Sequence, residues 1–456
     1  MITNTDLHYK GNQYPGAITR VERDVDTFSF FASNGVVLRL SLVRDSVVRV
    51  RYSVNGHFEN DFSYAIADDH LRGYNDLLYR EEDTYYALRT EKLEVHINKQ
   101  DMRVGMYTLD GETIVEDELG FHWEENHEYG GEYVKMSKFC RDGESYYGLG
   151  DKPMHANLKG KRVENWNTDE YAFGKDRDPI YKTVPFYIGL YNEISYGIFF
   201  DNTFKTHFDF AHERRDITSF WADGGEMNYY FFYGPQMKDV VKNYTNLTGV
   251  PEMPPMWTLG FHQSKWSYYP ESRFRELAEG FRKRNIPCDA LYLDIDYMDG
   301  FRCFTWDEEK FPNPKQMVAD LEKDGFKTVV IIDPGIKIDP DYSVYQEALK
   351  NDYFCKRSDG PYMKGKVWPG ECNFPDFTHP DVRTWWKGLY KELIGEIGVK
   401  GVWNDMNEPA VMEIPGKSFP PDVRHHYDGN PCSHRKAHNV YGMQMARATY
   451  EGVKKY

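Results

Sequence analysis

The sequence predicts an N-terminal antiparallel β-sandwich over residues 1–250, followed by an incomplete (β/α)8 TIM barrel over residues 251–456. In the first part, short segments alternate apolar and polar residues, as half-buried strands do. In the second part, apolar β-branched segments alternate with segments of helical periodicity, which indicates a parallel sheet covered by helices. The proline-rich residues 251–256 separate the two patterns and predict a domain boundary.

The strands expected in the first domain are short and are separated by turn signals. They cover residues 36–43, 47–54, 85–88, 93–98 and 187–191. Asn-Gly and Asp-Gly pairs, which favour tight turns, stand at 55–56, 110–111 and 142–143. Many short strands with such turns are typical of an antiparallel sandwich.

The second domain shows four strand–helix units. Its strands are expected at 258–262, 290–294, 328–333 and 401–404, and its helices at 273–284, 314–323, 382–397 and 439–456. Residue 251 is followed by 456 − 251 = 205 residues, whereas a complete barrel needs about 250. The last helix also lacks a Gly or Pro stop signal. We therefore expect the sequence to hold only the first half of the barrel.

Each expected barrel strand ends in a polar residue, namely His262, Asp294, Asp333 or Asp405. The carboxyl ends of parallel barrel strands open on one rim, where the catalytic residues of barrel enzymes lie. One Asp after a strand often caps the next helix, but four polar endings on one rim are harder to explain as caps. These residues are therefore candidates for a shared site.

The segment 403–409, Trp-Asn-Asp-Met-Asn-Glu-Pro, is the most informative of these strand ends. Asp405 and Glu408 place two carboxyl groups there, and carboxyl groups on either side of a sugar ring are the usual means of breaking a glycosidic bond. The two residues are the candidate catalytic groups. The alternative is that Asn404 and Asp405 only cap the following helix.

Composition excludes several classes of partner. The net charge of −16 argues against nucleic acid and against anionic membranes. No apolar run is long enough to span a bilayer, and residues 1–10 show no signal-peptide core, which predicts a cytoplasmic protein. The six cysteines lack metal-ligand spacing, so we expect neither a metal nor another cofactor. Aromatic residues make up 16% and suit sugar surfaces, although a β-rich core explains them equally well.

Several segments in a fixed order carry a resemblance to a known family. They are Gly148-Leu-Gly150, residues 166–169, residues 259–262 with Trp266, residues 293–298, residues 366–370 with 374–377, and residues 403–409. In these segments the chain resembles glycoside hydrolase family 31, whose members are mostly retaining α-glycosidases. The resemblance implies a galactose-mutarotase-like β-sandwich followed by a (β/α)8 catalytic barrel.

The resemblance also implies roles for single residues. Asp405 matches the catalytic nucleophile, and Asp294 matches the carboxylate that holds the distal hydroxyls of the glucosyl unit. Asp169 matches a residue on a sandwich loop that reaches over the barrel mouth. The residues that match the walls of the sugar pocket are Trp266, Ile336, Trp368, Trp403 and Met406. The family's general acid/base, and a substrate-binding Arg and His, correspond to positions beyond Tyr456.

These observations predict a retaining, exo-acting α-glucosidase that hydrolyses terminal α-linked glucose from oligosaccharides through a covalent glycosyl-aspartate. Glu408 would orient the loop and help set the pKa differences that such sites require. The alternatives are another α-glycosidase or an α-transglucosylase of the same family, a β-glycosidase that uses Glu408 as its acid, and a carbohydrate-binding protein without catalysis. The sequence leaves the oligomeric state open.

Simpler interpretations remain for individual residues. Trp266, Trp368 and Trp403 could be core aromatics, because buried aromatic side chains dominate protein cores. Asp296 and Asp299 are expected to cap a loop, and Asp333 with Pro334 could form a strand-ending turn. His434 and Arg435 are expected in a loop or helix cap.

Overall fold

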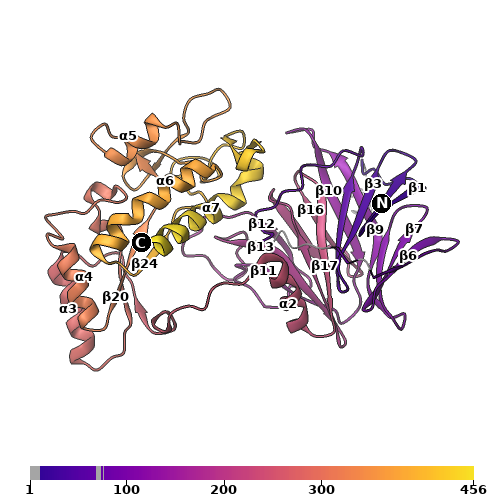
Figure 1. Ribbon diagram of the computed structural model, residues 1–456, viewed down its shortest axis with the longest axis horizontal. Coiled ribbons are helices and arrows are strands. Elements are labelled where there is room, and N and C mark those ends of the chain that lie inside the picture. Colours follow the sequence, from indigo (N-terminus) through magenta and orange to yellow (C-terminus); the bar gives the residue numbers. More distant parts are fainter. Residues whose placement is uncertain (1–10, 68–72, 75) are drawn as a thin grey trace. The chain divides into compact units, whose positions relative to one another are not determined.

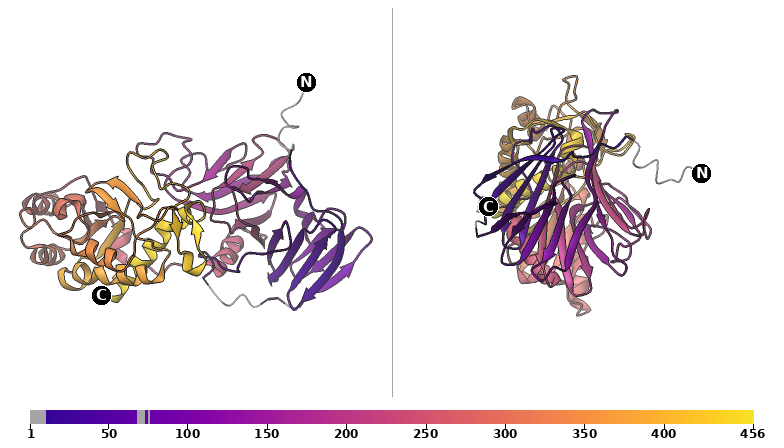
Figure 2. Two further views of the ribbon diagram at one scale, coloured as in Figure 1. Left: turned by 90° about the horizontal axis from the view of Figure 1, so that it is seen from above. Right: turned by 90° about the vertical axis from the view of Figure 1, so that its right-hand side faces the viewer.

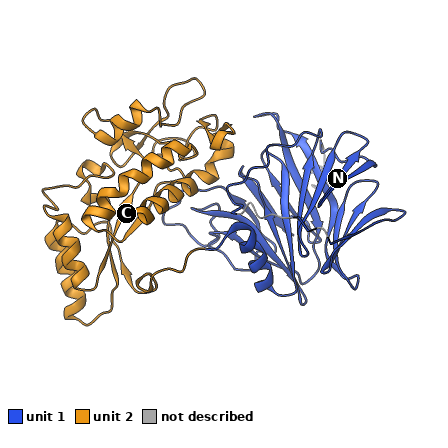
Figure 3. Ribbon diagram, viewed as in Figure 1, with its two compact units in different colours: residues 1–250 blue, residues 251–456 orange. Residues whose placement is uncertain are grey.

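The computed structural model describes residues 11–67, 73–74 and 76–456, which form two units, residues 1–250 and 251–456 (Figure 3). Residues 1–10, on which the signal-peptide prediction rests, lie outside the described residues. No helix in the described part is long and apolar enough to cross a membrane.

Unit 1 is a β-sandwich of two antiparallel sheets, as the sequence predicts (Figures 1 and 2). Within the described residues, one sheet holds, in spatial order, β1 (Ile18–Asp24), β2 (Thr27–Ala32), β3 (Val37–Arg44), β4 (Val47–Ser53), β17 (Met227–Gly234), β14 (Ile194–Phe200), β13 (Thr183–Tyr191) and β11 (Ser145–Gly150). The described strands of the other are β12 (Arg162–Asn165), β15 (Thr206–Phe210), β16 (Ile217–Ala222), β10 (Glu132–Phe139), β9 (Thr113–Glu125), β8 (Val104–Thr108), β7 (Leu93–Asn98), β6 (Tyr85–Arg89) and β5 (Leu78–Glu81).

The alternation of side chains explains how these strands pack. In β3, Leu38, Leu40 and Leu42 are buried while Arg39 is exposed, and Leu40 pairs with Val50 of β4. Apolar side chains from both sheets fill one core between them. The helix α2 (Met237–Thr248), which the sequence analysis did not predict, covers the outer face of the first sheet with Val240 and Leu247.

Unit 2 is built on a parallel sheet, as expected for part of a barrel. The described strands lie in the order β18 (His262–Gln263), β19 (Ala290–Leu293), β20 (Lys327–Ile332) and β24 (Gly401–Asn404). The first strand was predicted too early, because residues 256–259 form a 3-10 turn after the prolines. Proline fixes its own φ angle and has no backbone N–H to donate to a neighbouring strand. The segment just after the prolines therefore forms a turn, and the strand begins at His262.

The helices of unit 2 are α3 (Glu271–Lys283), α4 (Pro314–Lys323), α5 (Ser343–Lys350), α6 (Pro380–Tyr390) and α7 (His434–Lys455). The predicted helix 382–397 is α6 followed by a π-helical segment, Lys391–Ile397. α7 begins five residues earlier than predicted, with Ser433 as its N-cap, so His434 and Arg435, expected in a loop or helix cap, lie in its first turn. α6 and α7 pack side by side (Figure 1).

Two small antiparallel sheets interrupt the strand–helix order. The larger one holds β21 (Ile336–Lys337), β23 (Gly370–Asn373) and β22 (Lys364–Val367), and the smaller one holds β25 (Arg424–His425) and β26 (Cys432–Ser433). These strands are too short to show a period in the sequence. The larger sheet carries Trp368 in the turn between β22 and β23.

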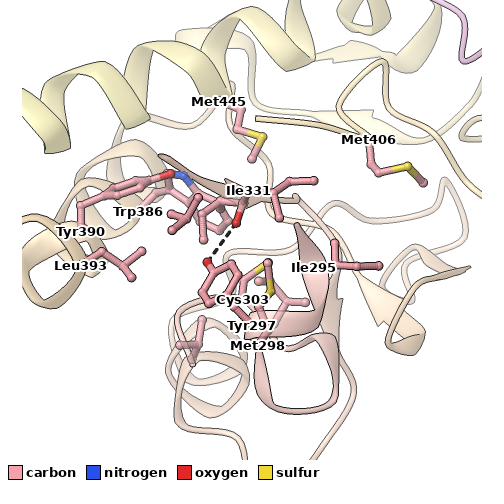
Figure 4. Close-up of a cluster of buried hydrophobic side chains, with 14 of the residues drawn as sticks. Ile295, Tyr297, Met298, Cys303, Ile331, Trp386, Tyr390, Leu393, Met406 and Met445 are labelled. Atoms are coloured by element: carbon pink, nitrogen blue, oxygen red, sulfur yellow. Dashed lines mark hydrogen bonds between the residues drawn. The ribbon is translucent and has the colours of Figure 1, made fainter. Parts of the chain in front are cut away.

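The core beneath the parallel sheet fixes the ends of its strands. Tyr297, in the 3-10 turn after β19, donates a hydrogen bond from its buried hydroxyl to the carbonyl of Ile331 in β20, at 3.0 Å (Figure 4). Trp386 and Tyr390 of α6 and Met445 of α7 belong to the same buried cluster. This packing joins β19 and β20 with α6 and α7 in one core.

Candidate active site

Three carboxyl side chains each follow the last residue of a parallel strand. Asp294 follows β19, Asp333 follows β20 and Asp405 follows β24. The three strands are neighbours in the sheet, and Ile332 of β20 pairs with Asn404 of β24. Glu408 lies three residues after Asp405. We call Asp294, Asp333, Asp405 and Glu408 the carboxylate cluster, because their charges act on one another.

Asp294 both caps a turn and belongs to the cluster. Its Oδ1 accepts a hydrogen bond from the backbone N–H of Ile295 at 2.7 Å, so the capping interpretation is correct in part. Burial raises the pKa of the Asp294 carboxyl, and the negative charges of Asp296 and Asp405 raise it further against the effect of that bond. A carboxyl in this setting favours hydrogen-bond donors such as sugar hydroxyls.

Asp333 was expected at the shared rim, but the sequence analysis gave it no catalytic or binding role. Its side chain is only 5% exposed, and burial raises its pKa well above the usual range. The charges of Asp405, Asp294 and Glu408 act in the same direction. The Oδ1 of Asp333 has no hydrogen-bond partner among the described residues. Asp333 directly follows the end of β20, so its position also agrees with the strand-ending turn expected from the sequence.

The loop after β24 is packed firmly against α7. Met406 has a left-handed backbone with φ of 58°, a strained conformation of the kind that clusters at functional sites. Gly442 of α7 lies so close that an added Cβ would come within 2.4 Å of the Asn407 carbonyl oxygen. Asn407 also donates from Nδ2 to the sulfur of Met445 at 3.6 Å. α7 therefore helps to hold Asp405 and Glu408 in place.

Two of the predicted aromatic residues, Trp266 and Trp368, lie next to each other. Trp266 is 63% exposed and Trp368 is 36% exposed, with ring centroids 5.3 Å apart. The core interpretation is wrong for these two residues. The indole N–H of Trp266 donates to the Asp296 carboxylate at 3.0 Å, so Asp296 helps to hold this ring. Trp403 is half-buried and packs partly against the core.

Other candidates take different positions. Ile336 has no exposed surface (0%), Met406 is buried, and both belong to the core cluster of unit 2. Asp169 lies in unit 1, in the half-buried loop between β12 and β13. Its expected role, like the roles of the other candidates, stays a prediction. Asp299 begins a 3-10 turn and pairs with Arg302, which agrees with a structural role.

One group in the described part of the chain has the composition of a metal site. Cys355, Asp376 and His425 are buried, with potential ligand atoms within 4.8 Å of one another. The Asp376 carboxylate, however, already accepts hydrogen bonds from Thr378, His425 and the backbone N–H of His426. Since these bonds occupy its oxygens, the group is better explained as a structural hydrogen-bond cluster.

Comparison with known proteins identifies the families that the two units resemble. A family model described as the glycosyl hydrolases family 31 TIM-barrel domain matches residues 251–456. A second, described as the glycosyl hydrolase 31 N-terminal galactose mutarotase-like domain, matches residues 37–209. Alpha-glucosidase 2 of Bacillus thermoamyloliquefaciens is 41% identical over 430 residues, which cover 94% of this chain and 53% of the relative.

Two further related proteins also match most of this chain but only about half of their own length. Alpha-glucosidase of Saccharolobus solfataricus is 34% identical over 71% of this chain and 49% of its own length. A solved family 31 dextranase of Flavobacterium johnsoniae, complexed with glucose, is 35% identical with a TM-score of 0.89, covering 97% of this chain and 53% of that one. The chain thus spans about half the length of these relatives.

Proposed function

Because the chain belongs to glycoside hydrolase family 31, we propose that it supplies the nucleophile half of a retaining, exo-acting α-glucosidase site that acts on oligosaccharides. The placement of Asp294 and Asp405 at the carboxyl ends of parallel strands of one sheet carries the proposal. Such strand ends are where barrel enzymes place their catalytic groups. The relatives that are named α-glucosidases support the substrate class.

In the proposed reaction, the Asp405 carboxylate attacks the anomeric carbon and forms a glycosyl ester. A retaining enzyme also needs a protonated carboxyl about 5–5.5 Å from the nucleophile, which gives its proton to the leaving oxygen and then activates water. Asp294 would accept hydrogen bonds from sugar hydroxyls distant from the cleaved bond. Trp266 and Trp368 would offer apolar faces to the sugar ring, because C–H groups pack well on aromatic surfaces.

Asp405 and the product anomer together test the proposal. Asp405→Asn in the native protein should abolish turnover of α-glucosides while circular dichroism shows an unchanged fold, because an amide cannot form the glycosyl ester. Two successive inversions give net retention, so proton NMR early in hydrolysis should show α-glucose first. Release of the β-anomer first, or cleavage of aryl β-glucosides alone, would contradict the proposed role of Asp405.

A second candidate function is hydrolysis of α-linked glucans by a dextranase-like activity. The solved Flavobacterium johnsoniae dextranase, also obtained in complex with isomaltotriose, matches almost the whole chain. Maltotriose and isomaltotriose offered together to the native protein would separate the two candidates by the rates of glucose release. A third outcome, transfer of glucose to the acceptor sugar, would indicate an α-transglucosylase.

A further inference from the structure

Asp333 belongs to the carboxylate cluster but has no role in the proposed reaction. It follows Ile332, and Ile332 pairs with Asn404, which precedes Asp405. The parallel register therefore places the Asp333 and Asp405 carboxyls on adjacent strands at the same level of the sheet. A charge on one of them acts directly on the other.

Nothing in the described surroundings of Asp333 favours an ionised carboxylate. The side chain is 95% buried, since 5% is exposed, and its Oδ1 lacks a hydrogen-bond partner among the described residues. Asp376 is a useful contrast, because it is also buried (8% exposed) but accepts bonds from Thr378, His425 and His426. Burial raises the Asp376 pKa, yet these donors outweigh burial and leave it lowered.

The groups that face Asp333 from the packed elements are acidic or neutral. Asp294 faces it from the end of β19, and Asp405 and Glu408 face it from the end of β24. Three further groups act as neutral neighbours at neutral pH, because burial raises the pKa of each: Tyr297, Cys303 and Cys372, the last to about 12. The charges that shift the Asp333 pKa are thus all negative in the described part of the chain.

We infer that Asp333 is a positioning residue that stays protonated at neutral pH and presents a neutral carboxyl to Asp405. The inference rests on the proposed function of Asp405. One proton held on Asp333 removes a negative charge from the cluster, so that Asp405 can remain ionised for attack.

Two neutral substitutions, Asp333→Asn and Asp333→Ser, test this role in the native protein. A residue that already works in its neutral form should tolerate them, so kcat/KM at pH 7 should change by no more than about threefold, whereas Asp405→Asn abolishes turnover. In the wild type, ionisation of Asp333 as the pH rises would add a charge beside Asp405 and lower activity. Both variants lack this charge, so the alkaline limb of their pH profile should move to higher pH.

Thermal unfolding without substrate gives a second readout that does not depend on activity. The folded-state pKa of Asp333 lies above its unfolded value of about 3.9, so its contribution to stability is present below that value and is lost as pH rises towards the folded pKa. The Tm of Asp333→Asn relative to wild type should therefore increase with pH above about 4. The matched control, Asp376→Asn, should lose stability at neutral pH, because it removes a buried acceptor of several donors.

The outcomes separate the role of Asp333 from the proposed function. If Asp405→Asn keeps its activity, the proposed function fails, and the pH dependence of the Asp333→Asn Tm still decides the protonation of Asp333. The positioning role is overturned by a loss of about 100-fold or more in both folded Asp333 variants, by an unchanged alkaline limb, or by a Tm difference that is constant with pH. Failure of both variants to fold would also overturn it, since a neutral side chain must tolerate neutral replacements.

Discussion

The carboxyl groups that follow the parallel strands differ in burial and in hydrogen bonding. Asp294 keeps one backbone donor and is half-buried, which leaves it open to a ligand. Asp333 has almost no exposed surface and lies among negative charges. The positions of Asp294 and Asp405 at strand ends could be predicted, because strand ends follow from the apolar runs. The burial of Asp333 could not, because the sequence places it at the same rim as Asp294 and Asp405 but does not show which of these side chains the packing covers.

Asp294→Ala should lower kcat/KM for glucosides in the native protein by roughly two orders of magnitude or more. A charged acceptor contributes about 1.5–3 kcal/mol per hydrogen bond, and about 1.4 kcal/mol corresponds to a factor of ten. These bonds should strengthen as the sugar ring flattens towards the transition state. Steady-state kinetics with glucosides and with 4-deoxy-glucosides measure the effect.

The 4-deoxy substrate is the control for this prediction. It lacks one hydroxyl that Asp294 would bind, so the substitution should harm its turnover much less. If Asp294 served only as the cap of the turn at Ile295, Asp294→Ala would lower the Tm and reduce turnover of both substrates equally. Equal losses on the two substrates would therefore refute a binding role.

Helices and strands could be predicted where the segment is long enough to show a hydrophobic pattern. The central strands β19, β20 and β24 and helices α3 and α4 follow from apolar runs and from helical periodicity. The two-residue strands β21, β25 and β26 and the π-helical end of α6 could not be predicted, because they depend on packing against the rest of unit 2. The early start of α7 was missed for the same reason: its first turn is held by buried histidines.

His425, His434 and His438, with Asp376, form a buried hydrogen-bond chain that we call the histidine chain. His425 Nδ1 lies 3.1 Å from Asp376 Oδ1, and His425 Nε2 lies 2.9 Å from His434 Nδ1. His434 Nε2 lies 2.9 Å from His438 Nδ1. An imidazole can donate from one nitrogen and accept on the other, so the chain ties the start of α7 to β25.

The histidine chain should make the protein sensitive to mild acid. Burial lowers the pKa of His434 well below its usual value, and His438 and His425 lower it further. Below about pH 6.5 the unfolded chain binds a proton that the folded His434 excludes, so stability falls as pH falls. His434→Gln should lower the Tm at pH 7 but should lose less further stability between pH 7 and pH 5 than the wild type does.

His127→Gln is the control for this experiment, because the His127 side chain is 84% exposed. Its Tm should follow the wild-type pH dependence throughout. The contribution of Asp376 falls in a separate range, since its lowered pKa means that its stabilisation is lost only as pH falls below about 3.9. An identical loss of Tm in wild type and His434→Gln between pH 7 and pH 5 would exclude His434 as the sensitive group.

At the scale of the whole molecule, unit 1 has the core, the strand pairing and the size that are typical of an independently folding domain. Its main core is formed by residues of unit 1 alone, and its sheets pair their described strands in antiparallel order. Its 250 residues lie within the usual size of an independent domain. By contrast, β18 and β24 lie at the two edges of the described parallel sheet of unit 2. An unpaired edge strand exposes hydrogen-bonding groups that favour association.

We therefore expect residues 11–250, expressed alone, to fold into a β-sandwich with a cooperative thermal transition. Phe231 is fully buried in the core between the sheets, and Phe231→Ala in this fragment should cost about 3–5 kcal/mol. For a domain of this size that loss lowers the Tm by roughly 6–20 °C. Phe139, which is 43% exposed at the end of β10, is the matched control, and Phe139→Ala should leave the Tm nearly unchanged. A fragment without a cooperative transition, or equal effects of the two substitutions, would show that the sandwich core does not fold on its own.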